Sequence, residues 1–286
     1  AGTLTLAANN TYSGGTIIGA GTLQVGSGGT SGSLGSGAVT NNSALVFNRS
    51  NTIVVSNSIS GAGSLTQAGG GTLTLTGNNT YSGGTTISTG TLQVGNSGTI
   101  GSLGSGDVSN NGALVFKRSD TNVVSNSISG TGSLTQAGAG TLTLLGTNTY
   151  SGSTFISAGT LQVGDGGTLG SLGSGDVTNN SVLAFNHNDG IVVSNAISGS
   201  GTLIQAGAGT LILAASNTYS GRTIISAGTL QVGDGGTIGS LGSGAVSNNS
   251  ILVFNRSDSI VVSNTINGTG SLTQAGKPWS ASGFAW

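Results

Sequence analysis

The sequence contains one histidine, and its side chain is the only one that is an ordinary general base near neutral pH. Asp189 follows His187 by two residues, so a Ser–His–Asp relay is the first reaction chemistry to consider. No G-x-S-x-G motif supplies a nucleophilic serine. The residues 69 positions before and after His187 are Arg118 and Arg256, so the histidine stands where a cation recurs. We therefore expect His187 to be a solvated loop residue without a catalytic role.

Carboxylates are the second group that could carry out a reaction. Enzymes that cleave glycosidic bonds place two carboxyl groups within about 10 Å of each other. The seven acidic residues here are all aspartates that share three positions of a 69-residue pattern, so equivalent carboxylates are a whole period apart. The calcium-binding nonapeptide of solenoids is not matched either, because Asp107 directly follows Gly106. Cysteine is absent. We expect no catalytic residue, no metal site and no cofactor.

The composition limits the partners of the chain. Charged residues make up 5% of the 286 residues and the net charge is -1, so the basic surface that nucleic-acid binding requires is missing. No apolar run approaches the ~20 residues of a membrane span, and we expect no membrane insertion by this segment. With 35% hydrophobic residues the chain nevertheless has a core to bury, which argues against disorder despite its 56 glycines.

A tandem repeat explains this composition. The string GTLTL occurs at Gly2, Gly71 and Gly140, and GTLIL follows at Gly209, so each step is 69 residues. Four copies follow one another without insertion or deletion, and a tail outside the pattern begins at Lys277. The predicted domains are a solenoid over 1–276, with repeats 1–69, 70–138, 139–207 and 208–276, and a non-repeat tail over 277–286.

Within each copy, apolar and polar residues alternate with period two, which is typical of half-buried β-strands. Gly, Asn and Ser clusters separate these short runs and indicate turns. The spacing predicts an all-β fold, a right-handed parallel β-helix with about three coils per repeat, in which Leu4, Leu23 and Leu45 lie on successive coils. The third coil would be enlarged, because the next equivalent leucine is Leu73. Four phenylalanines share one repeat position and should point inward: Phe47, Phe116, Phe185 and Phe254.

The motifs resemble a known family. GTLTLTGNNTYSGGTTIS followed by TGTLQVG, from Gly71 to Gly95, resembles the passenger-associated repeat of bacterial autotransporters, and SISGTGSLTQAGAGTLTL resembles a junction between two such repeats. The resemblance covers residues 1–276. It implies secretion across the outer membrane, a right-handed β-helix on the bacterial surface, and a role in adhesion, aggregation or biofilm. It implies no catalytic residues.

Three functions follow as hypotheses. The first is an extracellular, structural and adhesive surface solenoid, whose partners are a second copy of itself, glycans, or host and abiotic surfaces. The second is a self-assembling extracellular filament built by end-to-end stacking of solenoids. The third, a glycan-cleaving solenoid, requires a carboxylate cluster that the sequence does not predict.

Two groups of aromatic residues are candidates for contact. One recurs within the NTYSG motifs and forms either a surface ladder or a buried ring that packs a turn: Tyr12, Tyr81, Tyr150 and Tyr219. The other lies in the tail, which either caps the last coil or is disordered: Trp279, Phe284 and Trp286. Because no polar cap precedes Leu4, the first coil is expected to present an open edge that pairs with another chain.

Overall fold

The computed structural model describes residues 2–276, and their regular structure consists of strands of two to four residues. The strands pair in parallel, as expected, and stack into a β-solenoid. The described residues contain no helix, and hence none of the length and apolarity needed to cross a membrane. The chain divides into two compact units. One runs to Gly159 and includes Ser171–Gly175, and the other comprises Thr160–Gly170 and the chain from Asp176 onward.

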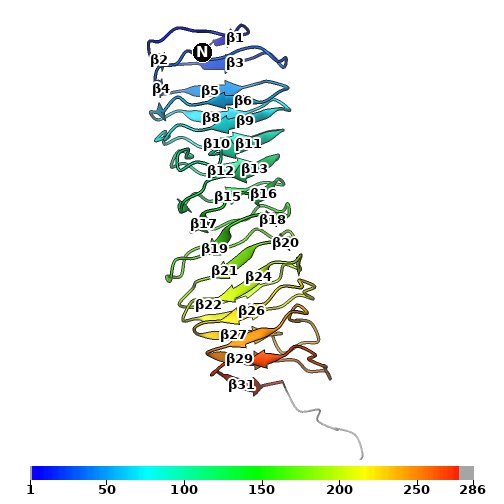
Figure 1. Ribbon diagram of the computed structural model, residues 1–286. Helices are drawn as coiled ribbons and strands as arrows, with labels where there is room; N and C mark the ends of the chain where they lie inside the picture. The colour runs from blue at the N-terminus through cyan, green and yellow to red at the C-terminus, as the bar shows by residue number, and fades with distance from the viewer. Residues whose placement is uncertain (1, 277–286) are drawn as a thin grey trace, which may run out of the picture. The chain divides into compact units, whose positions relative to one another are not determined.

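In the first unit the strands of successive coils lie above one another (Figure 1). The first sheet contains, in order, β1 (Thr3–Leu6), β3 (Thr22–Val25), β5 (Ala44–Phe47), β8 (Ser64–Gln67), β10 (Thr85–Ile87), β12 (Val108–Asn110) and β15 (Ile128–Ser129). The second sheet contains β6 (Ile53–Val55), β9 (Thr72–Leu75), β11 (Thr91–Val94), β13 (Ala113–Phe116), β16 (Ser133–Gln136) and β18 (Thr154–Ile156). Shorter ladders join β2 (Thr16–Ile18), β4 (Val39–Asn41) and β7 (Ile59–Ser60), and join β14 (Asn122–Val124) to β17 (Thr141–Leu144).

The second unit is built in the same way. One sheet contains β19 (Thr160–Val163), β21 (Val182–Phe185), β24 (Thr202–Gln205), β26 (Thr223–Ile225), β28 (Val246–Asn248) and β30 (Ile266–Asn267). Another contains β22 (Gly190–Val193), β25 (Thr210–Leu213), β27 (Thr229–Val232), β29 (Ile251–Phe254) and β31 (Ser271–Gln274). A short ladder joins β20 (Val177–Asn179) to β23 (Ile197–Ser198).

Neighbouring strands of the first sheet are 19 to 23 residues apart in the chain, which is the length of one coil. The predicted register is confirmed, because Leu4 lies beside Leu23 and Leu23 beside Leu45. The predicted enlargement of the third coil is wrong. Leu45 is paired with Leu65, one ordinary coil further on, whereas Leu73 belongs to the second sheet.

The expected value of about three coils per repeat has a remainder that matters for function. One coil passes through β5, β6 and β7, which lie in three different sheets, before β8 returns to the first sheet. Three coils therefore take the chain from Thr3 to Ser64, and the last eight residues of the period carry it to Thr72 in the second sheet. A repeat thus spans three coils and about a third of another. Equivalent strands of consecutive repeats lie in different sheets, as do β19 and β27 in the second unit.

The interior is filled by the inward-facing half of each strand. The alternation of exposed and buried residues that the period-two pattern predicts is seen in β3 and β5, where Leu and Val, then Leu and Phe, face inward. The four equivalent phenylalanines are buried, with 0 to 6% of their surface exposed, which confirms the predicted inward position. Each apolar side chain packs against the coils above and below it, so stability is a sum of contacts between neighbouring coils.

Candidate functional site

The tyrosines of the NTYSG motifs do not form a surface ladder. Tyr81, Tyr150 and Tyr219 are completely buried, whereas Tyr12 in the first coil is 40% exposed. Each buried hydroxyl lies 2.7 Å from the threonine hydroxyl four residues later. Burial raises the pKa of these three phenols. The ladder hypothesis is wrong for them and the buried-ring alternative is confirmed, because each ring packs against a glycine of the next coil, such as Gly104 over Tyr81.

The candidate end cap lies outside the described residues. Trp279, Phe284 and Trp286 all belong to the tail that follows residue 276. Both alternatives for the tail, a cap on the last coil or a disordered end, therefore stay predictions.

In the second repeat, side chains replace the strand ladder on one side of three successive coils. Asn79 donates from its Nδ2 to the carbonyl oxygen of Ser102, at 2.7 Å, and from its backbone nitrogen to the Ser102 hydroxyl, also at 2.7 Å. On the next coil, Asn126 Nδ2 donates to the carbonyl oxygens of Gly104 and Gly106, at 2.9 and 2.6 Å. A carboxamide carries the same donor and acceptor as a peptide group, so it can bridge coils where Gly and Ser form no strand. Both asparagines are buried.

These three coil segments surround a shallow hollow of about 300 Å³, lined by residues 79–80, 102–105 and 122–126. None of the lining side chains carries a charge. Leu103 and Val124 are nearly buried at its base, with 8% and 4% of their surface exposed. Val123 is 57% exposed. The hollow therefore combines hydroxyl and amide groups with an apolar base.

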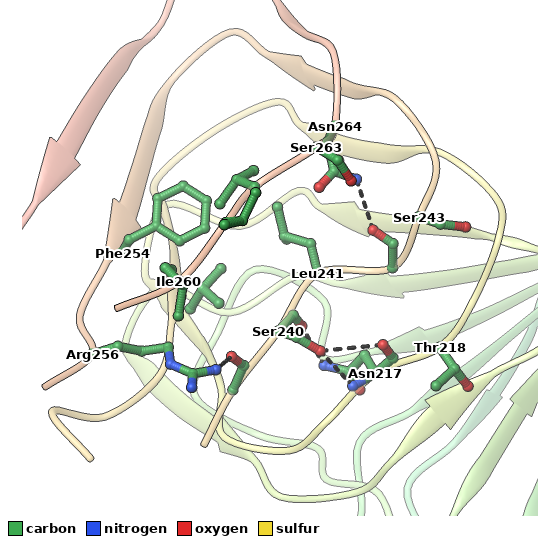
Figure 2. Close-up of a pocket in the computed structure, with 15 residues that line it drawn as sticks. Asn217, Thr218, Ser240, Leu241, Ser243, Phe254, Arg256, Ile260, Ser263 and Asn264 are labelled. Carbon is green, nitrogen blue, oxygen red and sulfur yellow. Dashed lines mark hydrogen bonds between the residues drawn. The ribbon is translucent and has the colours of Figure 1, made fainter. Parts of the chain in front are cut away.

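The fourth repeat contains a related hollow of about 530 Å³ (Figure 2). Asn217 Nδ2 donates to the Ser240 carbonyl oxygen at 2.7 Å, as Asn79 does to Ser102 in the second repeat. This hollow differs in chemistry, because Arg256 contributes to its wall and Ile260 occupies the position of Asn122.

Asn122 distinguishes the hollow of the second repeat. The other three repeats have isoleucine at this position: Ile53, Ile191 and Ile260. Ile53 is 9% exposed and belongs to the core. The Asn122 Nδ2 atom is buried and forms no hydrogen bond with any described residue. The candidate residues from sequence did not include Asn122, although an alignment of the four repeats marks it as the exception.

Arginine side chains hold a glycine-rich loop in three repeats. Arg118 donates through Nη1 to the carbonyl oxygen of Gly101 and through Nη2 to that of Thr99, both at 2.6 Å. Arg256 makes the equivalent bonds to Gly239 and Thr237, at 2.7 and 2.5 Å. The planar guanidinium supplies several donors in a fixed fork, which suits two carbonyl groups on one loop. The role of these arginines is structural.

The prediction that His187 is a solvated loop residue is wrong. It occupies the arginine position in the third repeat, beneath the glycine-rich loop, and is 5% exposed. Its Nδ1 lies 3.1 Å from Asp189 Oδ1, and its buried Nε2 has no hydrogen-bond partner among residues 2–276. The residue lies inward because this position places its side chain against Gly164 of the loop.

The Arg–Asp pairs predict a loss of stability in acid. A side-chain hydrogen bond from Arg118 lowers the pKa of Asp120 below its usual 3.8, and Arg256 lowers that of Asp258 in the same way. A carboxyl group with a lower pKa in the folded state stabilises the fold above the unfolded pKa and loses that contribution as the pH falls through the folded one. The urea midpoint should therefore be steady down to about pH 5 and fall below about pH 4.

The control for this prediction is the double variant Asp120→Asn with Asp258→Asn. Its urea midpoint should change less between pH 5 and pH 3 than that of the parent chain. A parent midpoint that rises on acidification would contradict the assigned direction of both pKa shifts.

The described residues offer no reactive cluster. Within residues 2–276, no three His, Asp or Glu side chains lie close enough together to hold a metal ion. What the two hollows do offer is hydrogen-bonding and apolar surface, which can bind a ligand but cannot transfer protons efficiently at neutral pH.

Comparison with known proteins agrees with the repeat structure. Four segments match the family model described as passenger-associated-transport-repeat, at residues 1–25, 65–94, 134–163 and 203–232. The chain is also 38% identical over 175 residues to the adhesin BmaC autotransporter of Brucella suis biovar 1 (strain 1330). That match covers 51% of this chain and 5% of the adhesin. No solved structure matches the chain. The 69-residue period, the parallel coils and these matches together show that the chain is a repeat domain of an autotransporter passenger.

Proposed function

We propose that this chain is an adhesive, non-enzymatic segment of a protein exposed on a bacterial surface. The passenger repeats and the adhesin relative support this proposal. The near absence of charge also supports it, because the surface offers hydroxyl and amide groups rather than a site for an ionic substrate. Its partners would be glycans, abiotic surfaces or a second copy of the chain.

The third of a coil left over in each repeat is the observation that carries the proposal furthest. Val54 and Val123 are equivalent residues, 55% and 57% exposed, and they lie in β6 and β14, which belong to different sheets. A surface feature that occurs once per repeat therefore faces a new direction in the next repeat. Such a stalk contacts neighbours on several sides, which suits aggregation of cells.

Display of the chain on the surface of a non-adherent bacterium tests the proposal. Cells that display it should bind to abiotic surfaces or to one another more than cells that display an unrelated solenoid at equal density. Light scattering on the purified chain separates adhesion by individual molecules from the filament alternative. Adhesion no greater than that of the control cells would contradict the proposal.

Adhesion should depend only weakly on ionic strength. The chain has 6 basic and 7 acidic residues, so few charges are available for salt to screen. Raising the salt from low to physiological concentration, which shortens the screening length to about 8 Å, should change adhesion less than about tenfold. A hundredfold loss in the same assay would show that a charged interface dominates the contact.

A further inference from the structure

We propose that the hollow of the second repeat, lined by residues 79–80, 102–105 and 122–126, binds a neutral glycan, with Asn122 as the specificity-determining residue. The inference rests on the proposed adhesive function only in placing the ligand on a cell surface. At about 300 Å³ the hollow is at the small end of the range for small-molecule sites. It is large enough for one sugar unit of a chain whose other units extend into solvent.

The lining favours a neutral ligand that carries hydroxyl groups. A charged ligand would lose hydration in this hollow without gaining a counter-charge, because no lining side chain is ionisable at neutral pH. Thr80, Ser105 and Ser125 are exposed. Their hydroxyl groups donate and accept hydrogen bonds, and a sugar hydroxyl offers the same two functions in return.

The backbone on this side is already satisfied, which argues against a peptide strand as the ligand. The carbonyl oxygens of Ser102, Gly104 and Gly106 accept bonds from Asn79 and Asn126. Strand addition requires a row of unpaired backbone groups at a sheet edge. Here β14 is paired with β17, and the coils of Asn79 and Ser102 are bridged by side chains. A ligand must therefore bind through side chains.

Apolar surface completes the match to a sugar. Leu103 and Val124 lie at the base and Val123 is exposed beside them. The ring face of a sugar carries C–H groups that pack on aliphatic side chains, while its hydroxyl groups reach the polar wall. A ligand of mixed character of this kind uses both parts of the hollow.

Asn122 is the residue that nothing in the fold requires. Isoleucine fills the equivalent position in the other repeats, and Ile53 is buried there. The amide has a buried Nδ2 atom with no partner in the described part of the chain, and buried polar atoms of this kind are rare in proteins. A residue that breaks the local rule at a cost in stability is the expected mark of a binding site. A carboxamide can donate to one sugar hydroxyl and accept from the next.

The decisive experiment uses the full chain on an array of neutral oligosaccharides of glucose, galactose and N-acetylglucosamine, with sialylated and sulfated glycans as charged comparators. At least one neutral oligosaccharide should bind and should then be titrated by calorimetry. Asn122→Ile should weaken that binding at least tenfold and at the same time raise the urea midpoint. A merely structural Asn122 would raise the midpoint and leave the affinity unchanged.

A second variant guards against indirect effects of the core substitution. Ser125→Ala removes a hydroxyl group from the hollow, and Ser56→Ala removes the equivalent hydroxyl from the first repeat, which has Ile53 in place of the amide. The first should weaken binding severalfold and the second should leave it unchanged. Equal effects of the two variants would overturn the assignment of the site.

The remaining outcomes separate this inference from the proposed function. Cells that adhere while the chain binds no neutral oligosaccharide would overturn the glycan site and leave adhesion standing. Preference for charged glycans, or for extended peptides on a peptide array, would overturn the ligand class. Glycan binding by a chain that does not make cells adhere would support the site and overturn the adhesive function.

Discussion

Replacing Gly104 with alanine should lower the free energy of unfolding by about 3 kcal/mol, a loss at the upper end for overpacked sites. A Cβ atom at Gly104 would lie 2.1 Å from the carbonyl oxygen of Tyr81 and 2.5 Å from its ring carbon Cδ2. Neither group can move at low cost. The carbonyl belongs to the backbone of the neighbouring coil, and the ring is completely buried with its hydroxyl group 2.7 Å from that of Thr85. Urea unfolding followed by circular dichroism measures the loss.

Gly98→Ala is the matched control. A Cβ at Gly98 would have no atom within 4 Å, and its φ is not in the left-handed region. The control should change the free energy of unfolding by less than about 0.5 kcal/mol. Gly173 and Gly242 stand in the same relation to Tyr150 and Tyr219, so alanine there should repeat the effect at Gly104. Similar losses at Gly98 and Gly104 would show that glycine entropy, and not the tyrosine contact, sets the cost.

Strand direction, register and core could be predicted from the sequence because they depend on local pattern. The alternation of Leu with small polar residues requires one buried face per strand, and equal spacing then places Leu4, Leu23 and Leu45 side by side. The inward position of Phe47 and Phe116 follows from their size and place in that alternation.

The number of residues per coil could not be read in the same way. The 28 residues between Leu45 and Leu73 were interpreted as one enlarged coil, whereas Leu65 closes an ordinary coil after 20. A repeat period fixes when a pattern returns but not which side it returns to. That depends on where the chain bends, and buried asparagines such as Asn79 and Asn126 help to set the corners by bonding to carbonyl groups one coil away.

The candidate site residues were the least predictable part. A recurring tyrosine is compatible with a surface or a core position, because its ring is apolar and its hydroxyl polar. Tyr81 is buried because Gly104 leaves room above its ring, a relation between residues 23 positions apart. Arg118 and His187 were read as solvated because charged residues usually are, but a long side chain can bury its stem and bond to loop carbonyls.

Truncating Phe116 to alanine should cost about 3–5 kcal/mol in the free energy of unfolding, as expected for a large buried side chain. Phe116 is 1% exposed and lies between Val94 on one coil and Gln136 on the next. Its removal leaves a cavity lined by these two residues, since the coils cannot close without breaking the ladders of β13. Equilibrium unfolding in urea gives the total loss.

Phe155→Ala is the control, because Phe155 lies in the same unit and is 39% exposed; it should cost less than about 1 kcal/mol. The distribution of the Phe116→Ala effect is the sharper test. In a solenoid each coil contacts only its neighbours, so hydrogen exchange should accelerate in β11, β13 and β16. The amides of β3, at the far end of the same sheet stack, should exchange at the parent rate. Uniform acceleration throughout the unit would mean that it unfolds as one cooperative body, and the description of its stability as a sum over neighbouring coils would then be wrong.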